Sequence, residues 1–192
     1  KVGRRVDTEV EVGPALRKDG SLPTPQQLYD APDAARDLDK LGFYNGKKNG
    51  VAWCDIFVDW CFVQAYGLEN AQKLTFQKIG KSNSGAGCKY SRNYYKNNGR
   101  LFDKPQPGDQ IFFYGSDLVD IAHTGLVVKV DETYVYTVEG NTSSASGVVA
   151  NGGCVREKKY KHTYNRLAGY GRPDYGITAS ESTPPTADAK GG

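Results

Sequence analysis

The sequence of 192 residues contains no methionine and only two histidines, two tryptophans and four cysteines. Since it begins with Lys1, we expect a processed or excised piece of a longer protein, in which a missing leader carries no information. No hydrophobic run approaches the length of a membrane span, so no transmembrane helix is predicted. Hydrophobic residues make up 38%, which is low for this length but enough for one core and one domain.

The charges are nearly balanced, with 25 Lys and Arg residues against 22 Asp and Glu residues and a formal net charge of +3. A chain this weakly basic gives no strong case for nucleic-acid binding. We expect neither a nucleic-acid partner nor a membrane partner. A weak preference for anionic polymers such as cell-wall material fits the charge.

The four cysteines are too scattered for a zinc site, because the sequence contains no Cys-x-x-Cys pair. We therefore predict no metal and no cofactor. One disulfide is compatible with the sequence. Cys88 and Cys154 are the favoured pair because both lie in predicted glycine-rich loops, and Cys61 with Cys88 is the alternative.

Residues 50–67 are the stretch on which the rest of the interpretation depends. Apolar residues recur there at helical spacing, and Gly67 follows the last of them, where helices commonly end. Cys54 would begin this helix, where unpaired backbone N–H groups stabilise a thiolate and favour a nucleophile. Asp55 would suit the positive end of the helix dipole. Cys61, about 10 Å farther along at the helical rise, is too distant for a disulfide with Cys54 and is interpreted as a core residue.

The other segments are assigned from turn residues and periodicity. The chain divides into an arm, a folded domain and a linker or tail, over residues 1–26, 27–176 and 177–192. Helices are expected over 33–41, 68–79 and 90–98, a loop over 81–88, and strands over 109–114, 122–130, 134–139, 148–150, 155–157 and 167–170. Helices followed by an antiparallel sheet predict an α+β fold. The loop at 43–50 carries two lysines instead of several carboxylates, so no calcium is predicted there.

His123 near the start of a strand, with Glu139 and Asn141 at the end of the next, could bring a base to the cysteine. Whether they share a face depends on the turn between the strands. A two-residue turn would send His123 and Glu139 to opposite faces. A three-residue connection would place Gly125 opposite Glu139 and His123 opposite Asn141. The site therefore requires an odd number of connecting residues or a corrective bulge.

In that register Cys54 is the candidate nucleophile and His123 the candidate base and acid. Glu139 or Asn141 would fix the tautomer of the ring, and backbone N–H groups at the helix start would hold an oxyanion. The competing interpretation is structural. Free cysteine is often simply buried, and His123 could be a satisfied core histidine. His162, in a lysine-rich stretch, is expected at the surface.

Four short motifs in this order resemble the CHAP domain, a family of papain-like cysteine, histidine-dependent amidohydrolases and peptidases. They are Trp53-Cys54-Asp55, Pro107-Gly108-Asp109, Ala122-His123-Thr124-Gly125 and Val138-Glu139-Gly140-Asn141. The resemblance covers roughly residues 27–176. It implies a papain-like fold with N-terminal helices packed on a C-terminal antiparallel sheet. It also implies Cys54 as nucleophile, His123 as general base, Glu139 as the orienting residue and Asn141 as a supporting polar residue.

The resemblance further implies an enzyme that hydrolyses an amide bond of bacterial peptidoglycan through a thioester. The bond would lie between muramic acid and L-alanine, or within the stem peptide and cross-bridge, as in phage lysins and autolysins. Such a protein would be phage-delivered or secreted, would act at the cell wall or outside the cell, and is expected to be a monomer with wall-binding modules beyond its C-terminal linker. The alternatives are an inert wall-binding or structural module and a metal-stapled interaction domain.

Overall fold

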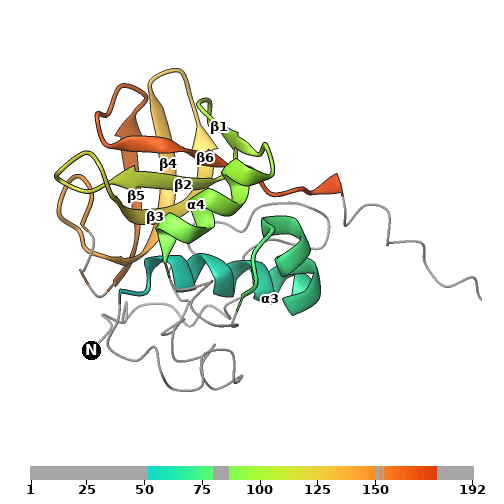
Figure 1. The fold of residues 1–192 in the computed structure, drawn as a ribbon. Coiled ribbons are helices and arrows are strands. Elements are labelled where there is room, and N and C mark those ends of the chain that lie inside the picture. The colour runs from blue at the N-terminus through green and yellow to red at the C-terminus, as the bar shows by residue number, and fades with distance from the viewer. Residues whose placement is uncertain (1–51, 80–86, 150–151, 153, 177–192) are drawn as a thin grey trace, which may run out of the picture.

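The computed structural model describes residues 52–79, 87–149, 152 and 154–176. In this part of the chain two helices come first and six strands follow, so the predicted α+β class is confirmed (Figure 1). The predicted arm over 1–26, the helix over 33–41, the loop at 43–50 and the tail over 177–192 lie outside the described residues. The domain boundaries drawn from them stay predictions.

Helix α3 spans Cys54–Thr75 and contains one interruption. Gly67 has φ 75° and ψ 162°, which are not helical values, so the helix beginning at Cys54 breaks where the sequence predicted its end. A second helical piece follows and stops at Thr75, four residues earlier than expected. Phe76 ends it in the left-handed conformation; its N–H donates to the Lys73 carbonyl at 3.4 Å, and the Gln77 N–H donates to the Gln72 carbonyl at 3.1 Å.

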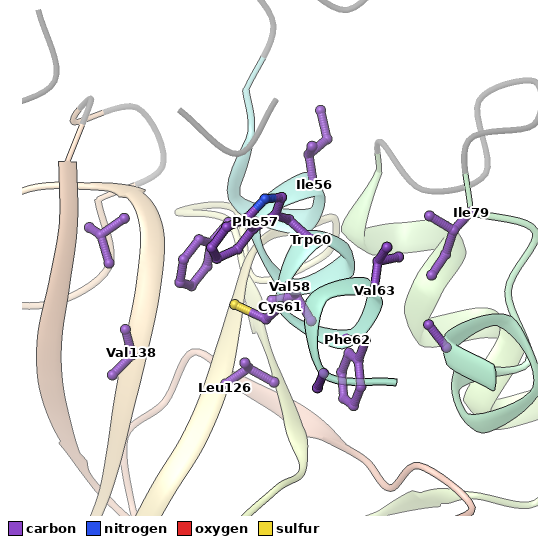
Figure 2. Close-up of a cluster of buried hydrophobic side chains, with 13 residues drawn as sticks. Ile56, Phe57, Val58, Trp60, Cys61, Phe62, Val63, Ile79, Leu126 and Val138 are labelled. Atoms are coloured by element: carbon purple, nitrogen blue, oxygen red, sulfur yellow. The ribbon is translucent and has the colours of Figure 1, made fainter. Parts of the chain in front are cut away.

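The first half of α3 is buried on every side, which explains why its sequence is apolar around the whole helix. Residues of α3 form a cluster with Leu126 of β3 and Val138 of β4 (Figure 2). Cys61 belongs to this cluster and is fully buried, as predicted. Burying one such large apolar side chain stabilises a fold by about 1.5–3 kcal/mol. This packing fixes the N-terminus of α3 relative to the two strands.

Helix α4 spans Cys88–Asn97, two residues ahead of its predicted start. The prediction that Cys88 lies in a glycine-rich loop is therefore wrong, because the residue forms the first turn of a helix. The three tyrosines of α4 differ in burial: Tyr95 is fully buried, Tyr94 is half-buried and Tyr90 is 57% exposed. The Tyr95 ring packs edge-on to Phe76 and against Phe112, so it belongs to the core.

Six antiparallel strands form one sheet in the order β1-β6-β2-β3-β4-β5. Their bounds are β1 Leu101–Phe102, β2 Gln110–Tyr114, β3 Ile121–Val130, β4 Tyr134–Thr142, β5 Cys154–Lys161 and β6 Leu167–Gly171. Four strands match their predicted segments to within a few residues, and β1 was not predicted. The last strand in the chain, β6, lies between β1 and β2.

The β3–β4 hairpin meets the requirement set by the sequence. Three residues, 131–133, connect the strands, and Val130 pairs with Val135. The register then shifts by one between Val127 and Lys129, after which Leu126 pairs with Val138. Continued by one residue, this register sets Gly125 opposite Glu139. The pair Val130–Val135 leaves an even number of residues, four, between the paired ends, so it is the bulge between Val127 and Lys129 that produces the pairing the candidate site needs.

The predicted strand over 148–150 is wrong where it can be checked, since residues 148 and 149 are not in a strand. β5 pairs directly with β4, with Thr142 opposite Cys154. The connection between them is held by Lys158, whose ammonium group donates hydrogen bonds to the carbonyls of Ala145 and Gly147. In this connection, hydrogen bonds from a lysine side chain take the place of the backbone hydrogen bonds that a short hairpin would form.

Candidate active site

Cys54 is the first residue of α3 and is buried, with 4% of its surface exposed. Trp53 precedes it without a side-chain cap, and the first backbone hydrogen bond of the helix runs from the Phe57 N–H to the Trp53 carbonyl. The N–H groups of the first turn ahead of Phe57 have no partner within the helix. The sulfur therefore lies where backbone dipoles favour negative charge.

His123 and Glu139 form a buried pair. Nε2 of His123 lies 2.8 Å from Oε2 of Glu139, and both side chains are fully buried. Two hydroxyls also donate to this carboxylate, Thr137 to Oε1 at 2.6 Å and Tyr160 to Oε2 at 3.2 Å. A methyl group on Gly125 would come within 2.5 Å of Glu139 Cγ, so glycine at this position makes room for the carboxylate. The hydroxyls of Thr137 and Tyr160 therefore fix the Glu139 carboxylate, which in turn fixes the His123 ring.

The Cys54 side chain interacts with the His123 ring. Nδ1 of His123 has no hydrogen bond of regular geometry among the described residues, yet the two groups are close enough to shift both pKa values. Such contacts are often poorly aligned before substrate binds. Burial lowers the pKa of His123, but hydrogen bonding to Cys54 and Glu139 and their negative charges outweigh it and raise the pKa to about 9.

The pKa of Cys54 lies well below its usual value. The largest cause is a hydrogen bond with the Cys88 side chain; burial opposes it, and the His123 ring and the Asp55 backbone N–H lower the pKa further. A lowered thiol pKa beside a raised imidazole pKa favours the thiolate–imidazolium form. This is the resting state of an activated cysteine nucleophile.

Cys88 is the residue of this site that the sequence did not identify. It begins α4, and its Sγ lies 3.5 Å from the carbonyl oxygen of Ile121, two residues before His123. All four cysteines are free, so neither Cys88–Cys154 nor Cys61–Cys88 is a disulfide in this structure. The hydrogen bond with Cys54, together with burial, raises the pKa of Cys88 far above the usual thiol range. Only the fold could reveal this contact, because the two cysteines lie on different helices.

Asp55 does more than complement a helix dipole. Its carboxylate is buried and accepts hydrogen bonds from Gln110 Nε2 at 2.9 Å, from Ser91 Oγ at 2.6 Å and from the Gly87 backbone N–H. Burial raises the pKa of Asp55 to about 7. The Ser91 hydroxyl also lies 3.0 Å from Gln77 Oε1.

Asn141 lies two residues beyond Glu139, is 1% exposed and has a positive φ of 54°. The β4–β5 register shifts between Glu139 and Thr142, and the Asn141 carbonyl accepts a hydrogen bond from the Gly152 N–H at 2.8 Å. Glu139 contacts Nε2 of His123 at 2.8 Å, and the roles of Glu139 and Asn141 stay predictions. Asn141 shapes the end of β4 beside them.

The other features weighed from the sequence lie apart from these residues. His162 is exposed, and its Nε2 lies 2.8 Å from the Asp131 carbonyl oxygen. In the described ranges there is no group of three or more His, Cys, Asp and Glu side chains suited to a metal ion. The same part of the chain holds no helix that is both long enough and apolar enough to span a membrane.

The comparison with protein families follows this geometry. A family model described as the CHAP domain matches residues 46–141, which is half of the chain. The chain belongs to the CHAP domain family. The matched segment contains Cys54, His123, Glu139 and Asn141 and ends before β5 and β6. No curated protein and no solved structure matches the chain significantly.

Membership in the CHAP family implies a cysteine, histidine-dependent amidohydrolase or peptidase whose substrate is peptidoglycan. The fold agrees, since two helices pack on an antiparallel sheet as in the papain-like architecture of CHAP domains. Two contacts of this CHAP domain come from parts of the chain that carry none of the recognised motifs. They are the Cys88 thiol on Cys54 and the Tyr160 hydroxyl on Glu139.

Proposed function

We propose that this CHAP domain cleaves an amide bond of bacterial peptidoglycan, with Cys54 as nucleophile, His123 as acid and base, and Glu139 as the residue that orients His123. The observation that carries the proposal is the buried His123–Glu139 pair, 2.8 Å apart, whose ring also interacts with the sulfur at the start of α3. This arrangement supports acyl transfer, because the base contacts the nucleophile on one side and the orienting carboxylate on the other.

In the first half-reaction the Cys54 thiolate attacks the amide carbonyl carbon. Backbone N–H groups at the start of α3, including that of Cys54, hold the resulting oxyanion. The His123 imidazolium then gives its proton to the departing amine, and a thioester remains on Cys54. In the second half-reaction neutral His123 takes a proton from water, which attacks the thioester and releases a carboxylate and the thiolate.

Glu139 keeps the charged ring in place during both steps. Its contact with Nε2 leaves Nδ1 as the nitrogen that exchanges protons with the sulfur and the substrate. Thr137 and Tyr160 hold the carboxylate from the other side and limit its rotation. Asn141, at the end of the same strand, is proposed as a supporting polar residue of the site.

Two bonds fit this mechanism equally well. An amidase would cut between muramic acid and L-alanine, and an endopeptidase would cut within the stem peptide or cross-bridge. Either enzyme would act at the cell wall or outside the cell as a monomer, delivered by a phage or secreted, and joined to wall-binding modules beyond residue 176. The alternative from another class is a wall-binding module without activity.

The test is mass spectrometry of purified peptidoglycan after digestion, with the Cys54→Ala variant as the blank. New fragments that the blank lacks would support the enzyme. A new L-alanine amine with a free lactyl carboxylate identifies an amidase, and new peptide termini identify an endopeptidase. The matched control is Cys61→Ala, which removes the other cysteine of α3 and should retain activity. Digests equal to the blank across several wall types would contradict the proposal.

A further inference from the structure

Two cysteines begin the two helices of the described residues, and the two helix starts meet. Cys54 opens α3 and Cys88 opens α4. Asp55 joins them, because it accepts hydrogen bonds from the Ser91 hydroxyl and the Gly87 backbone N–H of the α4 start. The 2.6 Å hydrogen bond from Ser91 to Asp55 brings the two helix starts together, so that the two thiols interact; both are buried, with 4% and 8% of their surfaces exposed.

In the proposed hydrolysis Cys88 lowers the pKa of Cys54 but takes part in no chemical step. Every bond-making and proton-transfer step is assigned to Cys54 and His123, with Glu139 as support. Cys61 and Cys154 differ from Cys88 in placement, since Cys61 is packed in the core of α3 and Cys154 lies opposite Thr142 on β5. The interactions that shift the pKa of Cys54 include Cys88 and neither of the other two. The nucleophile thus has one thiol neighbour.

We propose that Cys54 and Cys88 form an oxidisable dithiol, in which a two-electron oxidant of the peroxide class joins the two sulfurs and a thiol reductant separates them. The disulfide occupies the nucleophile, so the oxidised domain is inactive and the reduced domain is active. The regulatory consequence rests on the proposed hydrolase function. The disulfide itself does not, because it follows from the placement of the two sulfurs.

The chemistry balances in two steps. The Cys54 thiolate attacks hydrogen peroxide and, with one proton from the medium, gives a sulfenic acid and one water. Cys88 then attacks the Cys54 sulfur, the hydroxyl leaves with the Cys88 proton as a second water, and the S–S bond forms. Two thiols are oxidised and one peroxide is reduced to two waters. A dithiol reductant reverses the reaction by exchange and carries away the two electrons.

The environment of each sulfur suits its part. The lowered pKa of Cys54 makes it the thiolate that peroxide oxidises first, because susceptibility follows thiolate character. The raised pKa of Cys88 keeps it protonated until the sulfenic acid forms next to it. Cys88 also protects Cys54, because a sulfenic acid that condenses with a neighbouring thiol is not oxidised further to the irreversible sulfinic acid.

The experiment is peptide mapping of the peroxide-treated full chain under non-reducing conditions. Trypsin leaves Cys54 and Cys61 on one peptide, residues 49–73, so chymotrypsin is added to cleave between them at Phe57 or Trp60. We expect a linked pair that contains Cys54 and Cys88 and disappears with dithiothreitol. Sulfinic acid at Cys54 beside an unmodified Cys88, or a bond from Cys88 to Cys61 or Cys154, would overturn the proposal.

Activity on peptidoglycan gives the second measurement. After brief peroxide treatment the parent chain and Cys154→Ser should recover most of their activity with dithiothreitol. Cys88→Ser should lose this recoverable fraction and accumulate sulfinic acid at Cys54. Equal recovery in Cys88→Ser and the parent would contradict the regulatory role. If the reduced chain has no activity on any wall, the proposed function fails, whereas the mapped disulfide still decides the pairing.

Discussion

Gly140 of β4 lies so close to Phe57 of α3 that a methyl group on the glycine would be 2.5 Å from the Phe57 Cβ. The same methyl group would lie 2.9 Å from the Trp53 ring. Real Cβ atoms essentially never approach other atoms so closely, so only glycine permits this packing. Because Gly140 directly follows Glu139, this contact sets the start of α3 against the end of the strand that holds the orienting carboxylate.

The first prediction concerns this contact. Gly140→Ala should push α3 away from β4, lower the stability by about 1–3 kcal/mol and separate Cys54 from His123. We expect wall hydrolysis to fall more than the loss of folded protein explains. Thermal unfolding and single-time-point hydrolysis measure the two effects. Gly176→Ala is the control, since among the described residues its added methyl would meet only Asp174 Oδ1 at 3.4 Å. Full activity in Gly140→Ala would contradict the geometry.

The second prediction is a bell-shaped dependence of activity on pH. Activity should rise as Cys54 loses its proton, well below the usual thiol range, and should fall around pH 9 as His123 loses its proton. Above that pH the thiolate remains but the acid for the leaving amine is gone. The measurements are initial rates of hydrolysis and of Cys54 alkylation from pH 4 to 11, which separate the deprotonation of Cys54 from that of His123. Alkylation should rise once at low pH and persist. A rise only near pH 8–9 would refute the thiolate–imidazolium pair.

The third prediction concerns His123 and Glu139 themselves. His123→Ala should abolish hydrolysis and leave the fold intact. Glu139→Gln should reduce activity by about 10²- to 10⁴-fold, less than the loss in His123→Ala, because Glu139 orients the base without exchanging protons with substrate. Removal of the negative charge should also shift the alkaline limb below pH 9, since Glu139 helps to raise the His123 pKa. An unshifted limb, or a loss equal to that in His123→Ala, would indicate a different role for Glu139.

The fourth prediction uses the raised pKa of Asp55. Its value rises from 3.8 to about 7, mainly through burial, so the native state holds the proton more tightly than the unfolded chain does. Stability should therefore decrease as pH rises from about 4 to about 7. Asp55→Asn should flatten this slope in chemical denaturation measured across that range.

The control for Asp55 is Asp120→Asn, which removes an equal charge from an exposed site paired with Lys89. It should leave the slope near that of the parent chain. The same slope in Asp55→Asn as in the parent would show that Asp55 is ionised throughout, with the Ser91, Gln110 and Gly87 donors stabilising its charge.

Much of this arrangement could be predicted from local sequence. Turn residues, together with segments rich in β-branched and aromatic residues, located β2, β3, β4 and β6, and Gly67 marked the break in α3. The register between His123 and Glu139 also followed from counting, because side chains in strands alternate and only an odd connection or a bulge brings the two together. These features depend on neighbours in the chain, where residue type and spacing decide the outcome.

The rest depends on contacts between distant segments. Cys88 was assigned to a loop, because nothing in its neighbours shows that α4 begins beside Cys54. Asp55 was explained by the helix dipole, although its partners Ser91 and Gln110 come from other elements and bury it. The prediction of a strand over 148–150 was wrong because the turn signal at 151–153 was read as a tight hairpin, whereas β5 pairs with β4 across the longer connection over 143–153.

The position of β6 has a consequence for how this protein is made. Because β6 is the last of the described strands and lies between β1 and β2, the sheet of the described residues cannot close until Gly171 has left the ribosome. A chain interrupted at Asn141, where the family match ends, carries every proposed active-site residue but leaves β1 without its partner strand and β2 with one edge open. If the proposed activity holds, a cell that synthesises this CHAP domain would therefore hold no competent enzyme until translation has passed β6.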